Sequence, residues 1–209
     1  MKTYIYRLRS LAIILLLFIV TVSCDKDGDS VGISSVTYFP TFELTAGEMV
    51  VIKTGDTFTP GATVMEGDTE LTPDIEDGVD NTAPGIYYVV YSAVNGDGYS
   101  GSAVQTVIVH DPSIVATDVS GDIYDIGRPS RTGVISLVEG TNNIFYGTDM
   151  GFAGAFPMYF MMDGDTYVEL PQTYPLSATS VSGSYDPGTR QISVLIQPYG
   201  FDYTFQIID

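Results

Sequence analysis

Downstream of residue 24, this 209-residue chain shows almost no helical periodicity. It consists of short runs of Val, Ile, Tyr, Phe and Thr, separated by Gly, Asp, Asn and Pro. Runs of this composition fit the pleated strand, and the residues between them fit tight turns. Because 44% of the residues are hydrophobic, the chain can bury a substantial core, and disorder is not expected. The pattern predicts an all-β protein.

The clearest predicted unit is a hairpin whose strands run over Gly85–Val94 and Ser100–His110. Its turn contains Asn95-Gly96-Asp97-Gly98, and Asn and Gly tolerate the positive φ that tight turns require. The first strand is apolar on both faces, which is typical of a central strand covered on both sides. Earlier strands are expected within 48–53, 62–65 and 70–75.

Two motifs around this hairpin carry a family resemblance. They are GDTFTPGA (Gly55–Ala62) and DNTAPGIY (Asp80–Tyr87), and they are followed by Tyr91-Ser92-Ala93 and a closing strand to Val109. On these motifs, residues 33–111 resemble the bacterial immunoglobulin-like (Ig-like) domains of surface proteins. The resemblance implies an Ig-like β-sandwich in which Tyr87 starts a core strand, with its hydroxyl bonded to nearby backbone.

A second β-rich unit is predicted from residue 112 to residue 209. Pro112 cannot donate to a sheet ladder, so the segment His110-Asp111-Pro112 makes a natural boundary. Turns are expected at Gly164 and Gly188. The series suggests an antiparallel meander that closes into a second antiparallel β-sandwich or a partly open barrel. Strands are expected at 123–126, 133–138, 143–146, 158–162, 167–170, 180–185, 191–197 and 201–208.

This second unit also carries a resemblance, on Gly121–Tyr124, Tyr146–Gly154 and Gly183–Pro187 leading into Ile192-Ser193-Val194. It resembles the uncharacterised C-terminal domain that accompanies such Ig-like modules in Bacteroides surface lipoproteins. The resemblance implies a setting of glycan capture or nutrient acquisition.

The N-terminus has the pattern of a secretory signal. Lys2, Arg7 and Arg9 precede the apolar run Leu11–Val20, which is about half of the roughly 20 residues that a transmembrane helix needs. Small residues then lead to Cys24, the only cysteine. The segment resembles the bacterial lipoprotein signal, which implies that residues 1–23 are removed and that Cys24 is lipidated. The alternatives are an ordinary signal-peptidase cut that leaves Cys24 free and an uncleaved membrane anchor.

Residues 24–32 follow as an acidic tether. An acidic stretch directly after the cysteine resembles the export signal of Bacteroidetes surface lipoproteins. That resemblance implies a lipid-anchored protein in the outer membrane that faces the cell exterior. More than one acyl chain on Cys24 would anchor the protein stably.

The charge of the chain excludes several classes of partner. Without residues 1–23 the chain keeps 5 basic and 26 acidic residues, a net charge of −21. Nucleic acids and anionic membrane surfaces bind clustered Lys and Arg, so neither is expected as a partner. The membrane is reached only through the lipid on Cys24. No cysteine is left for an internal disulfide, so the core must stabilise the fold.

No catalytic constellation stands out in the sequence. His110 is the only histidine, and no G-x-S-x-G elbow accompanies it. A single His and a lipidated Cys do not make a zinc site, so neither a metal nor a cofactor is assigned. Calcium at acidic turns such as Asp163-Gly164-Asp165 stays open as an alternative. Asp149 and Glu169 stand in apolar surroundings, where a turn or strand-edge role is the simpler interpretation.

The best candidate for ligand binding is the stretch Phe145–Phe156. Its glycines allow close approach of a ligand to backbone, and Tyr146 and Phe152 could stack on sugar rings. Asp149 could accept hydrogen bonds from hydroxyl groups. Packing of these aromatic rings in the core is the alternative. The same alternative applies to the alternating residues Tyr199, Phe201 and Tyr203, which fit one face of a terminal strand.

The leading hypothesis is therefore a non-enzymatic surface lipoprotein that binds glycans or assists nutrient acquisition. An adhesin or structural module that contacts other surface proteins is the alternative. A glycan hydrolase would need a catalytic pair that the sequence does not reveal.

Overall fold

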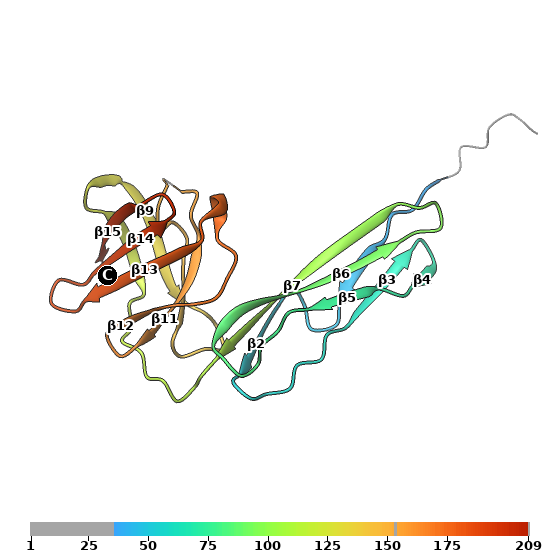
Figure 1. Cartoon of the computed structure of the whole chain (residues 1–209), viewed down its shortest axis with the longest axis horizontal. Helices are drawn as coiled ribbons and strands as arrows, with labels where there is room; N and C mark the ends of the chain where they lie inside the picture. Colours follow the sequence, from blue (N-terminus) through green and yellow to red (C-terminus); the bar gives the residue numbers. More distant parts are fainter. Residues whose placement is uncertain (1–35, 153, 209) are drawn as a thin grey trace, which may run out of the picture. The chain divides into compact units, whose positions relative to one another are not determined.

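The computed structural model describes residues 36–152 and 154–208 (Figure 1). The predicted signal segment, Cys24 and the acidic tether lie outside the described residues. Within them the chain forms fifteen strands and one 3₁₀ turn, η1 (Pro175–Ser177), and no α-helix. No helix in the described part is long and apolar enough to cross a membrane. The all-β prediction is confirmed.

The first seven strands form two facing sheets. One sheet has the order β1-β3-β4, and the other has the order β2-β7-β6-β5, in which β2 runs parallel to β7. Between them lies a core of Val89, Tyr91, Val107 and Val109, against which Phe42 packs from β1. The strands are β1 (Thr41–Leu44), β2 (Met49–Lys53), β3 (Ala62–Glu66), β4 (Thr69–Leu71), β5 (Asp74–Asp77), β6 (Gly85–Val94) and β7 (Ser100–His110). This is the predicted Ig-like β-sandwich.

The hairpin of β6 and β7 confirms two predictions in detail. Gly85 pairs with Val109 and Val94 pairs with Ser100, so the ladder covers the predicted range. The hydroxyl of Tyr87 donates to the Ala83 carbonyl at 3.1 Å, as expected for a tyrosine corner. Gly85 is needed beside it, because a Cβ there would lie 2.8 Å from the Tyr87 ring. In the turn, Gly98 takes the positive φ, at 89°.

Strand was expected in parts of residues 70–75, and these residues contribute to two strands that lie in different sheets. Thr69–Leu71 pairs with β3, whereas Asp74–Asp77 pairs with β6. The chain crosses from one sheet to the other at Pro73, which has no N–H to donate to a ladder. No strand was predicted at Thr41–Leu44, because this segment is too short to show alternation.

The remaining eight strands form a single antiparallel sheet with the order β12-β11-β10-β9-β8-β15-β14-β13. Of the two predicted arrangements, the partly open barrel describes this nearly closed sheet, because one core fills its interior. The strands are β8 (Gly121–Asp125), β9 (Arg128–Leu137), β10 (Ile144–Gly147), β11 (Met158–Asp163), β12 (Thr166–Glu169), β13 (Ser180–Asp186), β14 (Gln191–Gln197) and β15 (Phe201–Ile208).

Side chains close the seam between the edge strands β12 and β13. The Tyr167 hydroxyl donates to the Val181 carbonyl at 3.2 Å, and the Val181 N–H donates to Glu169 Oε1 at 2.7 Å. The Tyr174 hydroxyl donates to the same Glu169 oxygen at 3.0 Å. The Tyr167 ring lies against Gly183, where a Cβ would be 2.9 Å from the ring. Backbone groups of the β13 edge are therefore satisfied without a ladder.

Alternation along β15 determines which aromatic rings are buried. The side chains of Tyr203, Phe205 and Ile207 lie in the interior, at 8%, 2% and 2% exposed. Phe201 continues the same row at the start of the strand and is 49% exposed. One end of the sheet thus carries an exposed aromatic ring that is continuous with the core.

A separate cluster explains why β6 is apolar on both faces. Ile86 and Ile108, on the face away from the sandwich core, are buried with Val138, Ile144 and Leu170. The Ile86 N–H donates to the Pro171 carbonyl at 2.9 Å. The predicted covering of both faces of this strand is confirmed at its N-terminal end.

Candidate ligand-binding site

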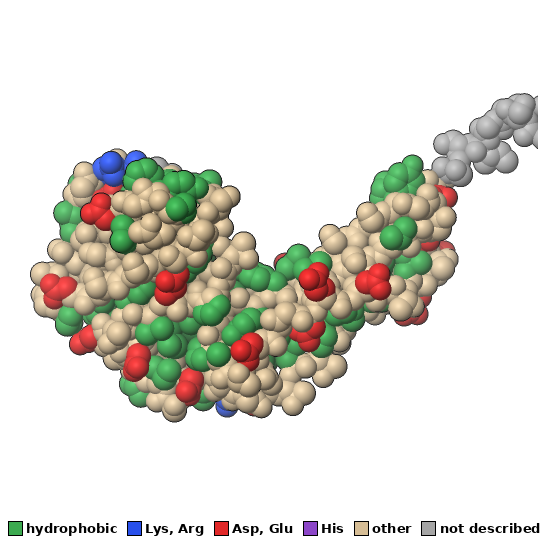
Figure 2. Space-filling model, in the orientation of Figure 1, with side chains coloured by type: hydrophobic (Ala, Val, Ile, Leu, Met, Phe, Trp, Pro, Cys, Tyr) green, Lys and Arg blue, Asp and Glu red, His purple; other side chains and the backbone are tan. Residues whose placement is uncertain are grey.

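A hollow of about 410 Å³ lies where β9, β15 and the loop after β10 meet. In a chain with 26 acidic and 8 basic residues, it combines aromatic and basic groups. Figure 2 shows a group of Lys or Arg side chains beside hydrophobic ones and a further basic side chain apart from it, while Asp and Glu are spread over the visible surface. The hollow is lined by Arg128, Arg131, Phe152, Phe201, Asp202 and Tyr203.

Phe152 is the centre of an aromatic cluster on this hollow. Its ring meets those of Tyr199 and Phe201 edge-on, with centroids 5.5 and 5.4 Å away. The rings of Tyr199 and Phe201 are 13° from parallel, with centroids 6.0 Å apart. They are 43% and 49% exposed, so part of each side chain is accessible to a ligand. Exposed, nearly parallel rings form a surface on which another flat apolar face can stack.

The backbone conformation of Phe152 and its hydrogen bond to β15 hold its ring at the hollow. Its φ is 54°, in the left-handed region that residues with a side chain rarely adopt. The Phe152 N–H donates to the Tyr203 hydroxyl at 3.3 Å, which ties the loop to β15. The Tyr199 hydroxyl donates to the Leu176 carbonyl. Unfavourable backbone that tertiary contacts hold in place is frequent at binding sites.

The structure does not bring the three predicted binding residues together. Phe152 lines the hollow, but Tyr146 on β10 packs against Tyr159, with ring centroids 4.8 Å apart, in the cluster around Ile86. Burial raises the pKa of the Tyr159 hydroxyl, with the neighbouring Tyr146 and Tyr88 adding to it.

Asp149 occupies its own turn and is 6% exposed. Its Oδ1 accepts the Gly151 N–H at 3.1 Å, and its backbone lies against Gly133 of β9. The carboxylate thus shapes the loop that carries Phe152 and does not line the hollow.

One arginine of the hollow is paired with a buried carboxylate. The Arg128 guanidinium lies 3.7 Å from Asp125 Oδ2, and the Asp125 side chain is 4% exposed. The other oxygen, Oδ1, accepts the Gly127 N–H at 2.8 Å. Oδ2 itself has no hydrogen bond from the described residues. The pair balances the charge of Asp125.

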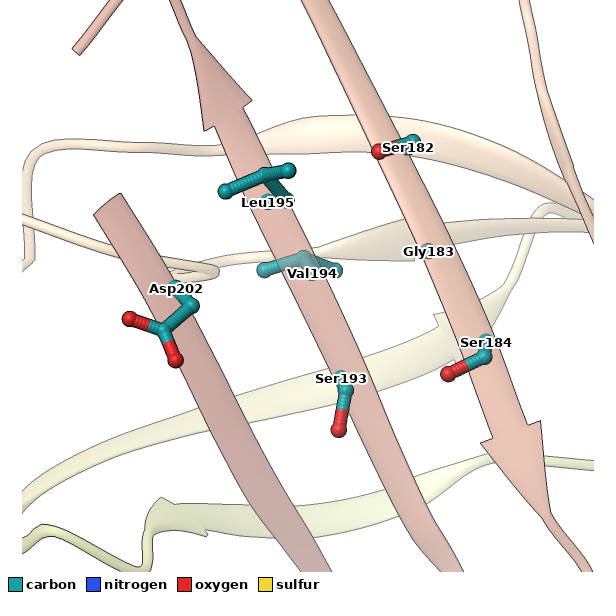
Figure 3. A pocket seen from close by; sticks show the side chains of 7 residues that line it. All are labelled: Ser182, Gly183, Ser184, Ser193, Val194, Leu195 and Asp202. Atoms are coloured by element: carbon teal, nitrogen blue, oxygen red, sulfur yellow. The ribbon is translucent and has the colours of Figure 1, made fainter. Parts of the chain in front are cut away.

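A second, shallower hollow of about 270 Å³ lies across β13, β14 and β15 (Figure 3). Ser182 and Ser184 border it on β13, and Ser193 borders it on β14. Asp202 lines both this hollow and the aromatic one. Hydroxyl groups that donate and accept hydrogen bonds therefore continue from the edge of the aromatic cluster.

Metal-ligating side chains do not gather in the described part of the chain. No cluster of three or more His, Cys, Asp or Glu among residues 36–152 and 154–208 could hold a metal ion. His110 is 4% exposed, and its Nδ1 lies 3.3 Å from Asn142 Oδ1. Glu169 serves the seam of the sheet.

Sequence reasoning missed the polar residues of the hollow. Arg128, Arg131 and Asp202 were not singled out. A signal was present, because basic residues are rare in this chain and two of them lie three residues apart, between the strands predicted at 123–126 and 133–138. Tyr199, Phe201 and Tyr203 were noted, but alternation alone does not tell an exposed strand end from its buried continuation.

Comparison with known proteins agrees with the first half of the fold. No curated protein matches the chain. A crystal structure of the lipoprotein BT2262 from Bacteroides thetaiotaomicron is similar, at 22% identity and a TM-score of 0.40, covering 82% of this chain and 100% of that one. Residues 42–109 match the family described as bacterial surface protein, Ig-like domain. The region predicted as Ig-like is therefore a domain of the kind found in bacterial surface proteins.

Proposed function

We propose that this protein is a non-enzymatic surface lipoprotein whose C-terminal sheet binds a glycan. The observation that carries the proposal is the exposed cluster of Phe152, Tyr199 and Phe201 beside polar side chains. Sugar rings present flat C–H faces and hydroxyl edges. Aromatic rings bordered by hydrogen-bonding groups suit both features, and pockets commonly lie at the ends of closed sheets.

The second hollow supports a ligand of more than one sugar. Asp202, Ser193 and Ser184 lie on three neighbouring strands (Figure 3). Because Asp202 lines both hollows, a chain stacked on Phe201 could continue toward Ser193 and Ser184. The hydroxyls of these serines are short and project little, which leaves room for an extended ligand.

Binding is tested with a glycan array and the full chain purified in detergent. Phe201→Ala should lower the affinity for the bound glycan about three- to tenfold. Burying a Phe side chain contributes roughly 1.5–3 kcal/mol, and about half of this residue is still available for burial. Tyr99→Ala removes a ring of the Ig-like domain that is 51% exposed and is the matched control.

Capture of a protein partner without any glycan binding would instead support the adhesin alternative. Glycan binding that Phe201→Ala leaves intact would place the site elsewhere.

The anchoring part of the proposal rests on Cys24 and the signal pattern before it. The Ig-like domain match supports a surface location. Labelling with a radioactive fatty acid should mark the wild type and not Cys24→Ala, with Ser30→Ala as the control. An unlabelled wild type would contradict lipidation. Protease treatment of intact cells tests whether the chain faces outward from the outer membrane.

A further inference from the structure

The distribution of basic residues sets the aromatic hollow apart from the rest of the surface. The chain carries a formal charge of −18, and the described residues include only Lys53, Arg128, Arg131 and Arg190 as Lys or Arg. Two of these four line one hollow. A neutral sugar needs no such concentration of positive charge, so the arrangement points to a more specific ligand.

The two arginines differ in how their charge is balanced. Arg128 pairs with Asp125, but no carboxylate of the described residues lies within ion-pairing distance of Arg131, which is half-buried. Nor does either guanidinium stack on an aromatic ring within the described part of the chain. A guanidinium stays protonated in proteins, so Arg131 brings a positive charge and a planar fork of N–H donors to the hollow, where Asp202 is the one lining carboxylate among the described residues.

We infer that the hollow binds an acidic glycan, with Arg131 holding a carboxylate or sulfate group while Phe201 stacks on the sugar ring. This inference rests on the proposed glycan-binding function. Arginine binds planar or tetrahedral oxyanions through two parallel hydrogen bonds, which gives both affinity and orientation. Asp202 then faces sugar hydroxyls and disfavours an oxyanion on its own side of the hollow. The overall negative charge of the protein disfavours other contacts with the same ligand.

The test compares charged oligosaccharides with neutral counterparts of the same length, by calorimetry on the full chain in detergent. Oligogalacturonate against its methyl ester tests the carboxylate, and a sulfated galactan oligosaccharide against its desulfated form tests the sulfate. One charged form should bind at least about tenfold more tightly than its neutral counterpart, equivalent to about 1.4 kcal/mol. Which one binds identifies the anion.

Arg131→Gln should abolish the preference for the charged oligosaccharide. It should also make binding less sensitive to salt, because the arginine charge that salt ions screen has been removed. Lys53→Gln makes the same change in net charge at an exposed position of the Ig-like domain and should leave binding unchanged.

Equal binding of charged and neutral forms, or an Arg131→Gln variant that behaves like Lys53→Gln, would overturn the inference. If neutral glycans bind and Phe201→Ala weakens them, the proposed function stands without it. If no glycan of either kind binds, both fail.

Discussion

The seam between β12 and β13 offers the sharpest test of how the C-terminal sheet is held together. Tyr167→Phe removes only the hydroxyl that donates to the Val181 carbonyl at 3.2 Å. Val181 is fully buried and Tyr167 is 8% exposed, so water cannot readily replace the lost donor. A typical hydrogen bond contributes about 1 kcal/mol net, and a buried carbonyl left unpaired costs about 1–3 kcal/mol. We expect the free energy of unfolding to fall by about 1–3 kcal/mol.

Urea unfolding followed by far-UV circular dichroism measures this change. The midpoint should fall while the m-value stays constant, because the variant exposes the same surface on unfolding. Tyr185→Phe is the matched control on β13, since no hydrogen bond of its hydroxyl is found within the described residues. Amide hydrogen exchange adds a local readout. Glu169→Ala should speed exchange of the Val181 N–H, which donates to Glu169 at 2.7 Å.

Two results would refute the reasoning. One is a Tyr167→Phe variant as stable as Tyr185→Phe. The other is unchanged exchange at Val181 in Glu169→Ala, which would mean that these side chains do not close the seam.

Three further predictions follow from buried contacts. Tyr91→Phe should destabilise the Ig-like domain by about 1–3 kcal/mol in denaturant unfolding, because the buried Gln105 side chain loses the hydrogen bond from the Tyr91 hydroxyl at 2.8 Å. A change below about 0.5 kcal/mol would contradict this. Gly183→Ala should cost about 1–3 kcal/mol by overpacking, since its Cβ would meet the Tyr167 ring at 2.9 Å, and an unchanged melting temperature would exclude that contact. Burial raises the pKa of Tyr167 and Tyr174 above the usual value of 10. The stability that these protonated hydroxyls contribute is therefore fully present below pH 10 and is lost as the pH rises further. Unfolding midpoints measured from pH 8 to 11 should show the decline, and a flat profile would argue against burial of these hydroxyls.

Elements with strong local patterns were predictable from sequence. β6 and β7 combine β-rich composition with an Asn-Gly turn, and their predicted ends agree with the ladder from Gly85 to Val94. The Pro-Gly step before Tyr87 predicted that its hydroxyl bonds to nearby backbone, as it does. The split at Pro73 was missed, because composition does not reveal when a chain changes sheets.

The candidate site was predictable only in part, since Phe152 was found from its glycine-rich surroundings while its partners were not. Phe152, Phe201 and Arg131 belong to segments far apart in the chain, and they meet only through the pairing of β9, β8 and β15. Tyr146 lies close to Phe152 in sequence but packs in a different cluster.

The sequence by itself determined the all-β class, the Ig-like first half and the pattern that predicts lipidation of Cys24. These features depend on local composition and on motifs of neighbouring residues, which need no long-range contact to be recognised. Only the tertiary structure decided that the second half is one nearly closed sheet, joined at its seam by Tyr167 and Glu169. It also decided which aromatic rings stay exposed, because the burial of alternating residues depends on where each strand ends in the sheet.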